Sequence, residues 1–230
     1  MNVTALEELL QGCDIHKDQS YMLWRLQQND LDLTLFPLGD YTKQAIVALA
    51  RRENLVAEDF SESQDVCFIP DGDYRRFLAQ EVADRLVSIG AGDLVDAEGR
   101  VLGRHPGFYH FTIGQRKGFG IGFGERRYVT AIDAAANRVT IGAEAELRCA
   151  SLLLEDVNWV SSIPLPSFRG QIRLRYKHRG AEGVVTALTE DRVRIDFDEP
   201  QKAVTPGQSA VAYDRERLIL GGIISQKSVN

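Results

Sequence analysis

From Gly90 onward, the apolar residues recur at every second position, which is the spacing of β-strands. The last third of the sequence contains five short segments of this kind, with turn residues between them: 171–177, 183–188, 192–197, 209–213 and 218–224. Short strands at such even intervals are typical of a small antiparallel barrel. The sequence therefore predicts a β-barrel in this part of the chain.

Other segments predict what precedes the barrel. Residues 93–102 alternate on either side of a turn at Gly99, and residues 128–141 on either side of a turn at Asn137, so each predicts a β-hairpin. Helical spacing predicts helices at 19–28, 42–53 and 74–85, the second of them capped by Asp40 or Thr42. The predicted class is α+β: a helical segment, a small mixed or β domain, and a barrel.

Composition excludes several classes of protein. A net charge of −6 argues against a protein that coats nucleic acid indiscriminately, although it permits a local basic face. No apolar run is long enough to span a bilayer, and residues 1–10 do not resemble a signal peptide. Cys13, Cys67 and Cys149 form neither a CxxC pair nor a zinc spacing. We therefore expect free thiols, no metal site, no membrane partner and a reducing cytoplasm.

A dense polar run, residues 12–21, opens the first predicted helix. One interpretation is structural, since Asp18 or Ser20 could cap that helix. The other is functional, because Lys17 and Gln19 at a helix start could donate hydrogen bonds to phosphates or base edges. Both interpretations stay open at this point.

Cys67 lies where a polar loop enters the short apolar segment 66–69. A lone cysteine in such a place is most often a buried and inert small hydrophobe. As a sulfur carrier, Cys67 would need access to solvent and a stabilised thiolate.

Residues 169–179 carry six basic side chains and no acid. Within this segment Ile172, Leu174 and Tyr176 alternate with three cations at strand spacing: Arg173, Arg175 and Lys177. The cationic face is either a solvated outer face of a barrel strand or a phosphate-contacting surface.

A second basic segment, residues 112–122, is rich in glycine and contains Arg116 and Lys117. Its glycine spacing does not match a Walker loop, and no strand–GK[ST]–helix context surrounds it. We therefore do not predict a nucleotide site there.

Together, these segments resemble the MnmA-type tRNA-specific 2-thiouridylases. The matching motifs run collinearly over residues 10–226: Gly12-x-Asp14-x-x-Lys17-Asp18-Gln19-Ser20-Tyr21, Phe36-Pro37-Leu38-Gly39, residues 62–69, Gly72-Asp73-Tyr74, residues 114–118, Arg175-Tyr176 and Thr205-Pro206-Gly207-Gln208. Several motifs in a fixed order are far more specific than any one of them alone.

The resemblance implies a domain plan and an activity. Residues 1–73 would be the helical remainder of an α/β catalytic domain, 74–145 a central domain, and 146–230 a tRNA-binding β-barrel. In such enzymes ATP activates the 2-oxygen of the wobble uridine, and a cysteine persulfide then delivers sulfur to C2 in steps that are each easier than a direct displacement. By resemblance the chain is a tRNA-uridine 2-sulfurtransferase, and Cys67 carries the persulfide.

The resemblance also implies contacts and partners. Lys17, Asp18 and Gln19 match a tRNA-contact triplet, and three further contacts are implied in the barrel: Arg175, Tyr176 and Gln208. The basic residues Arg116, Lys117 and Arg173 are additional candidates. The implied partners are tRNA and a sulfur-relay protein or cysteine desulfurase system.

Two departures from the family bear on the expected activity. The sequence contains no SGGxDS loop for ATP, and neither Cys13 nor Cys149 matches the family's first catalytic cysteine, which closes a disulfide to release the product. We therefore expect ATP to be bound by a missing N-terminal half or a separate PP-loop chain, and this chain alone to be inactive. The alternatives are a non-catalytic tRNA-binding module that lost its ATP domain and, third, an unrelated β-barrel protein.

Overall fold

The structure is a computed structural model, and it describes residues 6–56, 76–77, 81, 89–120, 122, 124–161 and 163–229. The chain divides into two compact units. The first unit comprises the described parts of Met1–Asp59 and Cys149–Asn230, and the second those of Phe60–Arg148. The first stretch of the chain thus belongs to the same compact unit as the last.

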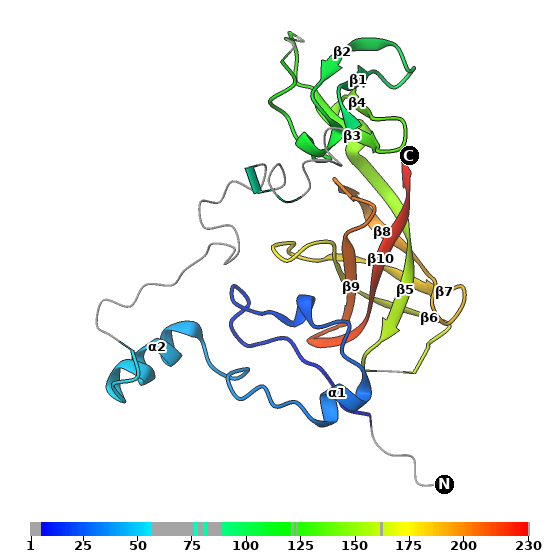
Figure 1. The fold of residues 1–230 in the computed structure, drawn as a ribbon. Coiled ribbons are helices and arrows are strands. Elements are labelled where there is room, and N and C mark those ends of the chain that lie inside the picture. The colour runs from blue at the N-terminus through cyan, green and yellow to red at the C-terminus, as the bar shows by residue number, and fades with distance from the viewer. Residues whose placement is uncertain are drawn as a thin grey trace. The chain divides into compact units, whose positions relative to one another are not determined.

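The C-terminal part of the first unit is a closed barrel of six strands in the order β10-β5-β8-β7-β6-β9 (Figure 1). The strands are β5 (Arg148–Trp159), β6 (Ser167–Arg173), β7 (Ala181–Ala187), β8 (Val193–Lys202), β9 (Ser209–Asp214) and β10 (Arg217–Val229). Each described register between neighbouring strands is antiparallel. The prediction of a small antiparallel barrel is confirmed.

Two details of the predicted barrel were wrong. Strand β5 was not predicted, because Leu152, Leu153 and Leu154 interrupt the two-residue alternation. The strand predicted at 171–177 ends at Arg173, and the chain then turns. Five of the six strands were predicted, because each is a short alternating or apolar segment bounded by turn residues.

The barrel interior is a continuous apolar core that includes Leu154, Ile172, Ile195 and Leu220. A second core forms where the N-terminal segment packs on the barrel: Leu9, Tyr21, Trp24 and Leu31 meet apolar residues of the barrel strands and of the chain beside them. Figure 1 shows this blue segment beside the ends of β9 and β10.

Backbone contacts fix the N-terminal segment to β10. The Leu218 amide donates to the Leu9 carbonyl oxygen over 2.9 Å, and the Gln11 amide donates to the Glu216 carbonyl oxygen over 2.8 Å. Leu10 and Arg217 form an antiparallel bridge. The segment therefore pairs with the barrel through its backbone as well as through its side chains.

The helical part is shorter than predicted. Residues 19–28 were expected to form one helix, but they contain the 3-10 turn η1 (Ser20–Met22), and the short helix α1 (Gln28–Asp32) begins at their end. Packing of Tyr21 and Trp24 on the barrel replaces the helical repeat. The helix at 42–53 is confirmed as α2 (Lys43–Arg52), and Thr42 caps it by accepting from the Ala45 amide.

The second unit contains a four-stranded mixed sheet in the order β2-β1-β4-β3. Its strands are β1 (Gly92–Val95), β2 (Val101–His105), β3 (Tyr128–Asp133) and β4 (Arg138–Gly142). Both predicted hairpins are confirmed, and the parallel pairing of β1 with β4 makes the sheet mixed. Two further 3-10 turns, η2 (Phe108–His110) and η3 (Glu144–Leu147), complete the described elements of this unit.

The α+β fold class is therefore confirmed, with a small helical part, a mixed sheet and a barrel. The helix predicted at 74–85 lies largely outside the described residues. The boundaries 1–73, 74–145 and 146–230 stay a prediction.

Candidate nucleic-acid interface

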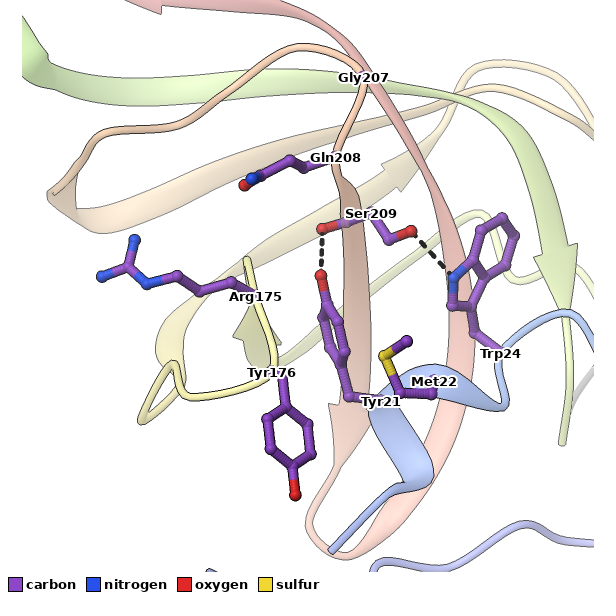
Figure 2. A pocket seen from close by; sticks show the side chains of 8 residues that line it. All are labelled: Tyr21, Met22, Trp24, Arg175, Tyr176, Gly207, Gln208 and Ser209. Atoms are coloured by element: carbon purple, nitrogen blue, oxygen red, sulfur yellow. Dashed lines mark hydrogen bonds between the residues drawn. The ribbon is translucent and has the colours of Figure 1, made fainter. Parts of the chain in front are cut away.

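One pocket of about 310 Å³ lies in the first unit, between the N-terminal segment and two turns of the barrel (Figure 2). Three short stretches line it: Tyr21, Met22 and Trp24; Arg175 and Tyr176; and Gly207, Gln208 and Ser209. It contains three of the residues predicted to contact tRNA, namely Arg175, Tyr176 and Gln208. The fold therefore brings together predicted contacts from two separate motifs.

Tyr21 and Trp24 form the inner wall of the pocket, and both bind to Ser209. The Tyr21 hydroxyl donates to the Ser209 carbonyl oxygen over 2.8 Å, and the Trp24 indole N–H donates to the Ser209 Oγ over 3.1 Å. Burial raises the pKa of Tyr21 to about 12, although the positive charge of Arg175 opposes this shift. This wall is therefore uncharged at physiological pH, and two hydrogen bonds hold it to Ser209.

Gln208 is held at the mouth by a tight turn. Pro206 and Gly207 occupy its two central positions, and Gly207 has a φ of 85°, which a residue with a side chain rarely adopts. The Gln208 amide donates to the Thr205 carbonyl oxygen, and the Gly207 amide to the Ile224 carbonyl oxygen of β10. The Gln208 side chain is exposed.

The turn between β6 and β7 presents Arg175 and Tyr176. Buried Leu174 anchors this turn at one end, and at the other Gly180 has a φ of 91°. Arg175 is exposed and Tyr176 is partly exposed, at 37%. Among the described residues no carboxylate forms an ion pair with Arg175. Figure 2 shows its side chain and that of Gln208 extending to the same side, away from Trp24.

The predicted alternation of outward cations along residues 169–179 was wrong. Arg173 is buried instead: its side chain is 6% exposed and forms an ion pair with Asp18 over 2.7 Å. Because β6 ends at Arg173, Arg175 and Lys177 lie in the following turn and not on a strand face. Arg173 is therefore not an exposed cation, whereas Arg175 is.

The polar run at residues 12–21 contains both exposed and buried side chains in the structure. Lys17 and Gln19 are exposed, whereas Asp18 between them is buried. Asp18 does not cap an α-helix as one interpretation had it: its carboxylate accepts from the amide of Ser20, the first residue of the 3-10 turn η1, whose N-cap position is Gln19. Asp14 caps α2 through the Lys43 amide, and this hydrogen bond is the main reason its pKa is lowered.

The glycine-rich loop with Arg116 and Lys117 lies in the second unit, and both side chains are exposed. The Gln115 side chain closes the loop by accepting from the Thr112 amide and donating to the Lys117 carbonyl oxygen. The loop leads into strand β3. It therefore presents two cations on a defined turn.

Cys67 and the rest of residues 57–75 lie outside the described residues, so its predicted role stays a prediction. Of the described cysteines, Cys13 is exposed and Cys149 is buried, and neither forms a disulfide. No group of metal-ligating side chains occurs within the part of the chain that the structure describes. No described helix is long and apolar enough to cross a membrane.

Sequence reasoning missed Met22, Trp24 and Ser209 as pocket residues, and it cited Tyr21 only within a motif. Apolar residues at 21, 23, 24 and 26 were interpreted as one face of a helix. Trp24 was the available signal, because a large aromatic beside a polar motif is frequent in binding surfaces.

The lining has a clear chemical character. Tyr176 offers a partly exposed ring, Met22 an exposed thioether, Arg175 a cation, and Gln208 an amide that both donates and accepts. No acidic residue lines the pocket. This combination suits a planar, polar ring attached to an anionic group.

Comparison with known families places three models in succession along the chain. A tRNA methyl transferase HUP domain matches residues 2–71, a tRNA methyl transferase PRC-barrel domain matches 75–143, and an aminomethyltransferase beta-barrel domain matches 149–224. The third match coincides with the six-stranded barrel.

Curated relatives extend over nearly the whole chain. Proteins named tRNA-specific 2-thiouridylase MnmA are 41% identical in Chlorobaculum tepidum, 42% in Carboxydothermus hydrogenoformans and 44% in Acidithiobacillus ferrooxidans. These alignments cover 96%, 95% and 94% of this chain, but only 61%, 60% and 61% of the relatives. The chain thus spans about 60% of the length of the curated relatives it matches.

Proposed function

The chain belongs to the family of MnmA-type tRNA-specific 2-thiouridylases, and we propose that it supplies the tRNA-binding surface and the sulfur-carrying cysteine for 2-thiolation of a wobble uridine. The single observation that carries the tRNA-binding part is the pocket. It joins Arg175 and Tyr176 to Gln208, although these residues come from different turns.

The pocket fits one unstacked nucleotide of the tRNA. A single-stranded base stacks on aromatic side chains and presents its edges to polar groups. The Tyr176 ring would stack on the base, the Gln208 amide would contact its edge, and the Arg175 guanidinium would bind a neighbouring phosphate. Lys17 and Gln19, exposed on the loop before η1, would extend the contact along the ribose-phosphate chain.

Arg116 and Lys117 would provide a second contact from the other unit. Both are exposed on a turn fixed by Gln115. Two cations on such a turn suit the phosphate backbone, where contacts add affinity without reading the sequence.

Sulfur transfer would use Cys67. ATP, bound by a half of the enzyme whose SGGxDS loop this sequence does not contain, would supply a leaving group on the 2-oxygen of the uridine. The outer sulfur of a Cys67 persulfide would attack C2, and the bond from C2 to the activated oxygen would break. A second cysteine thiolate would then attack the inner sulfur and release the thiolated base, leaving a disulfide. A thiol reductant would then reduce this disulfide, and a cysteine desulfurase or relay protein would reload the Cys67 thiol with persulfide sulfur.

The test is a reconstitution. We expect no 2-thiouridine when tRNA is incubated with this chain, ATP and a sulfur donor. Adding the purified ATP-binding half of a relative should restore 2-thiouridine with the parent chain and with Cys13→Ser, but not with Cys67→Ser. The modified nucleoside is measured by mass spectrometry of digested tRNA.

Two outcomes would overturn parts of this proposal. Formation of 2-thiouridine by this chain alone would refute the need for a second half. Equal thiolation by the Cys67→Ser variant would remove the sulfur-carrying role and favour the alternative, a non-catalytic tRNA-binding module.

A further inference from the structure

Asp18 and Arg173 form a buried ion pair between two distant parts of the chain. The distance between Arg173 Nη1 and Asp18 Oδ2 is 2.7 Å, and the side chains are 6% and 2% exposed, respectively. Asp18 lies in the loop before η1, and Arg173 is the last residue of β6. Their sequence positions suggested RNA contacts, but neither side chain is accessible to a polynucleotide.

The Asp18 carboxylate is fully occupied by protein donors. Oδ1 accepts from the amides of Gly12 and Ser20, and Oδ2 accepts from the Ser20 hydroxyl and from Arg173. A carboxylate would also repel phosphate if it were exposed. Burial against a cation removes that repulsion from the centre of the Lys17–Gln19 motif.

Arg173 is equally committed to the protein interior. Its Nη2 donates to the Gln11 Oε1 over 3.1 Å, and its guanidinium lies over the Tyr213 ring at 5.0 Å. The Tyr213 hydroxyl is 3.1 Å from the Ser20 hydroxyl, which closes the network. The Arg173 Nε is buried without a hydrogen-bond partner among the described residues. Apolar side chains of similar volume often stabilise a fold as well as a buried ion pair does. A role in fixing one geometry is therefore indicated for this network.

Each residue of the ion pair is followed closely in the sequence by a residue that lines the pocket. Three residues after Asp18 comes Tyr21, which forms the inner wall, and two residues after Arg173 comes Arg175. Lys17 and Gln19 adjoin Asp18 directly and are exposed. The ion pair therefore connects two of the chain segments that line the pocket.

We propose that Asp18 and Arg173 are a positioning pair that fixes Tyr21, Lys17 and Gln19 relative to Arg175, and that neither of them contacts the RNA. This inference rests on the proposed function of the pocket as a tRNA-binding site. It assigns the acid of the Lys17-Asp18-Gln19 motif a role different from that of its two neighbours.

The test is a mutant cycle between Asp18 and Arg175 on the full chain. Binding of tRNA is measured for the parent, Asp18→Asn, Arg175→Ala and the double variant, at a temperature well below the melting point of each. In the parent we expect Arg175→Ala to weaken binding by about tenfold. In the Asp18→Asn chain the same change should cost less than about threefold, because Arg175 is no longer aligned with the other contacts.

Three results are decisive. An undiminished effect of Arg175→Ala in the Asp18→Asn chain overturns the positioning role alone. Tighter tRNA binding by Asp18→Asn also overturns it, since that is the result expected when an exposed acid leaves an RNA contact. No effect of Arg175→Ala in the parent overturns the pocket as the tRNA site, and the positioning role with it.

Two further variants complete the experiment. If circular dichroism shows that Asp18→Asn does not fold, Arg173→Lys takes its place, because it keeps the charge but loses the fork that reaches both Asp18 and Gln11. Arg169→Met is the matched control on the same strand, since Arg169 is exposed and pairs with Asp198. It should leave both tRNA binding and the effect of Arg175→Ala unchanged.

Discussion

The Tyr21 hydroxyl donates a hydrogen bond to the Ser209 carbonyl oxygen over 2.8 Å, and thereby joins residues 188 positions apart. Ser209 is the first residue of β9, directly after the turn that presents Gln208. The contact holds the N-terminal segment against the barrel at the inner wall of the pocket. Several measurable properties depend on this arrangement.

Stability at alkaline pH should depend on two buried tyrosines. Burial raises the pKa of both Tyr21 and Tyr213 from 10.0 to about 12. The unfolded chain therefore loses these protons at lower pH than the folded chain, so their contribution is complete below pH 10 and is lost between about pH 10 and 12. The urea midpoint should fall less steeply over this range in Tyr21→Phe and Tyr213→Phe.

The matched control for this experiment is Tyr41→Phe, because Tyr41 is 52% exposed. Its urea midpoint should follow the parent curve. An unchanged slope in both buried variants would contradict the assignment.

Arg175 should contribute one phosphate contact. We expect Arg175→Gln to weaken tRNA binding and to reduce the slope of log K against log salt by about one. Filter binding over a salt series measures both quantities. Arg194→Gln is the control, since Arg194 is exposed but already paired with Asp196, and its slope should equal that of the parent. Equal slopes for all three chains would exclude a phosphate contact by Arg175.

Tyr176 should act through its ring and not through its hydroxyl. Tyr176→Ala should weaken tRNA binding by about 1–3 kcal/mol, the usual cost of losing one base–aromatic stack. Tyr176→Phe keeps the ring and should bind within about twofold of the parent. Because Tyr176 is partly exposed in a turn, neither change should alter the melting temperature appreciably. A larger loss in the Phe variant than in the Ala variant would argue for a hydrogen bond instead.

Gly221 should be intolerant of any side chain. A Cβ at this position of β10 would lie 2.5 Å from Cβ and Cγ of Trp24. Since these are not the flexible end of the tryptophan side chain, Gly221→Ala must displace Trp24 and should destabilise the chain by about 1–3 kcal/mol. Denaturant unfolding measures the change. Gly122→Ala, whose Cβ would meet nothing within 4 Å, should be nearly neutral by comparison.

The strands of the barrel and both hairpins could be predicted because their signal is local. In β7 and β8 neighbouring residues largely alternate between core and surface, whereas β9 and β10 contain continuous buried runs, at 210–213 and 218–222. Turn residues separate these strands in the sequence. The N-cap Thr42 could be predicted for the same reason. Strand β5, with its run of three leucines, was not predicted.

The sequence alone determined the family and the α+β class, and it singled out Arg175, Tyr176 and Gln208, which the structure places on one pocket. Only the tertiary structure decided that Tyr21 and Trp24 pack on the barrel as pocket walls and do not form a helix, and that Arg173 is withdrawn from the surface. The reason is physical: the partner of Arg173 is Asp18, 155 residues away, and no local pattern reveals which cation a distant carboxylate will bury.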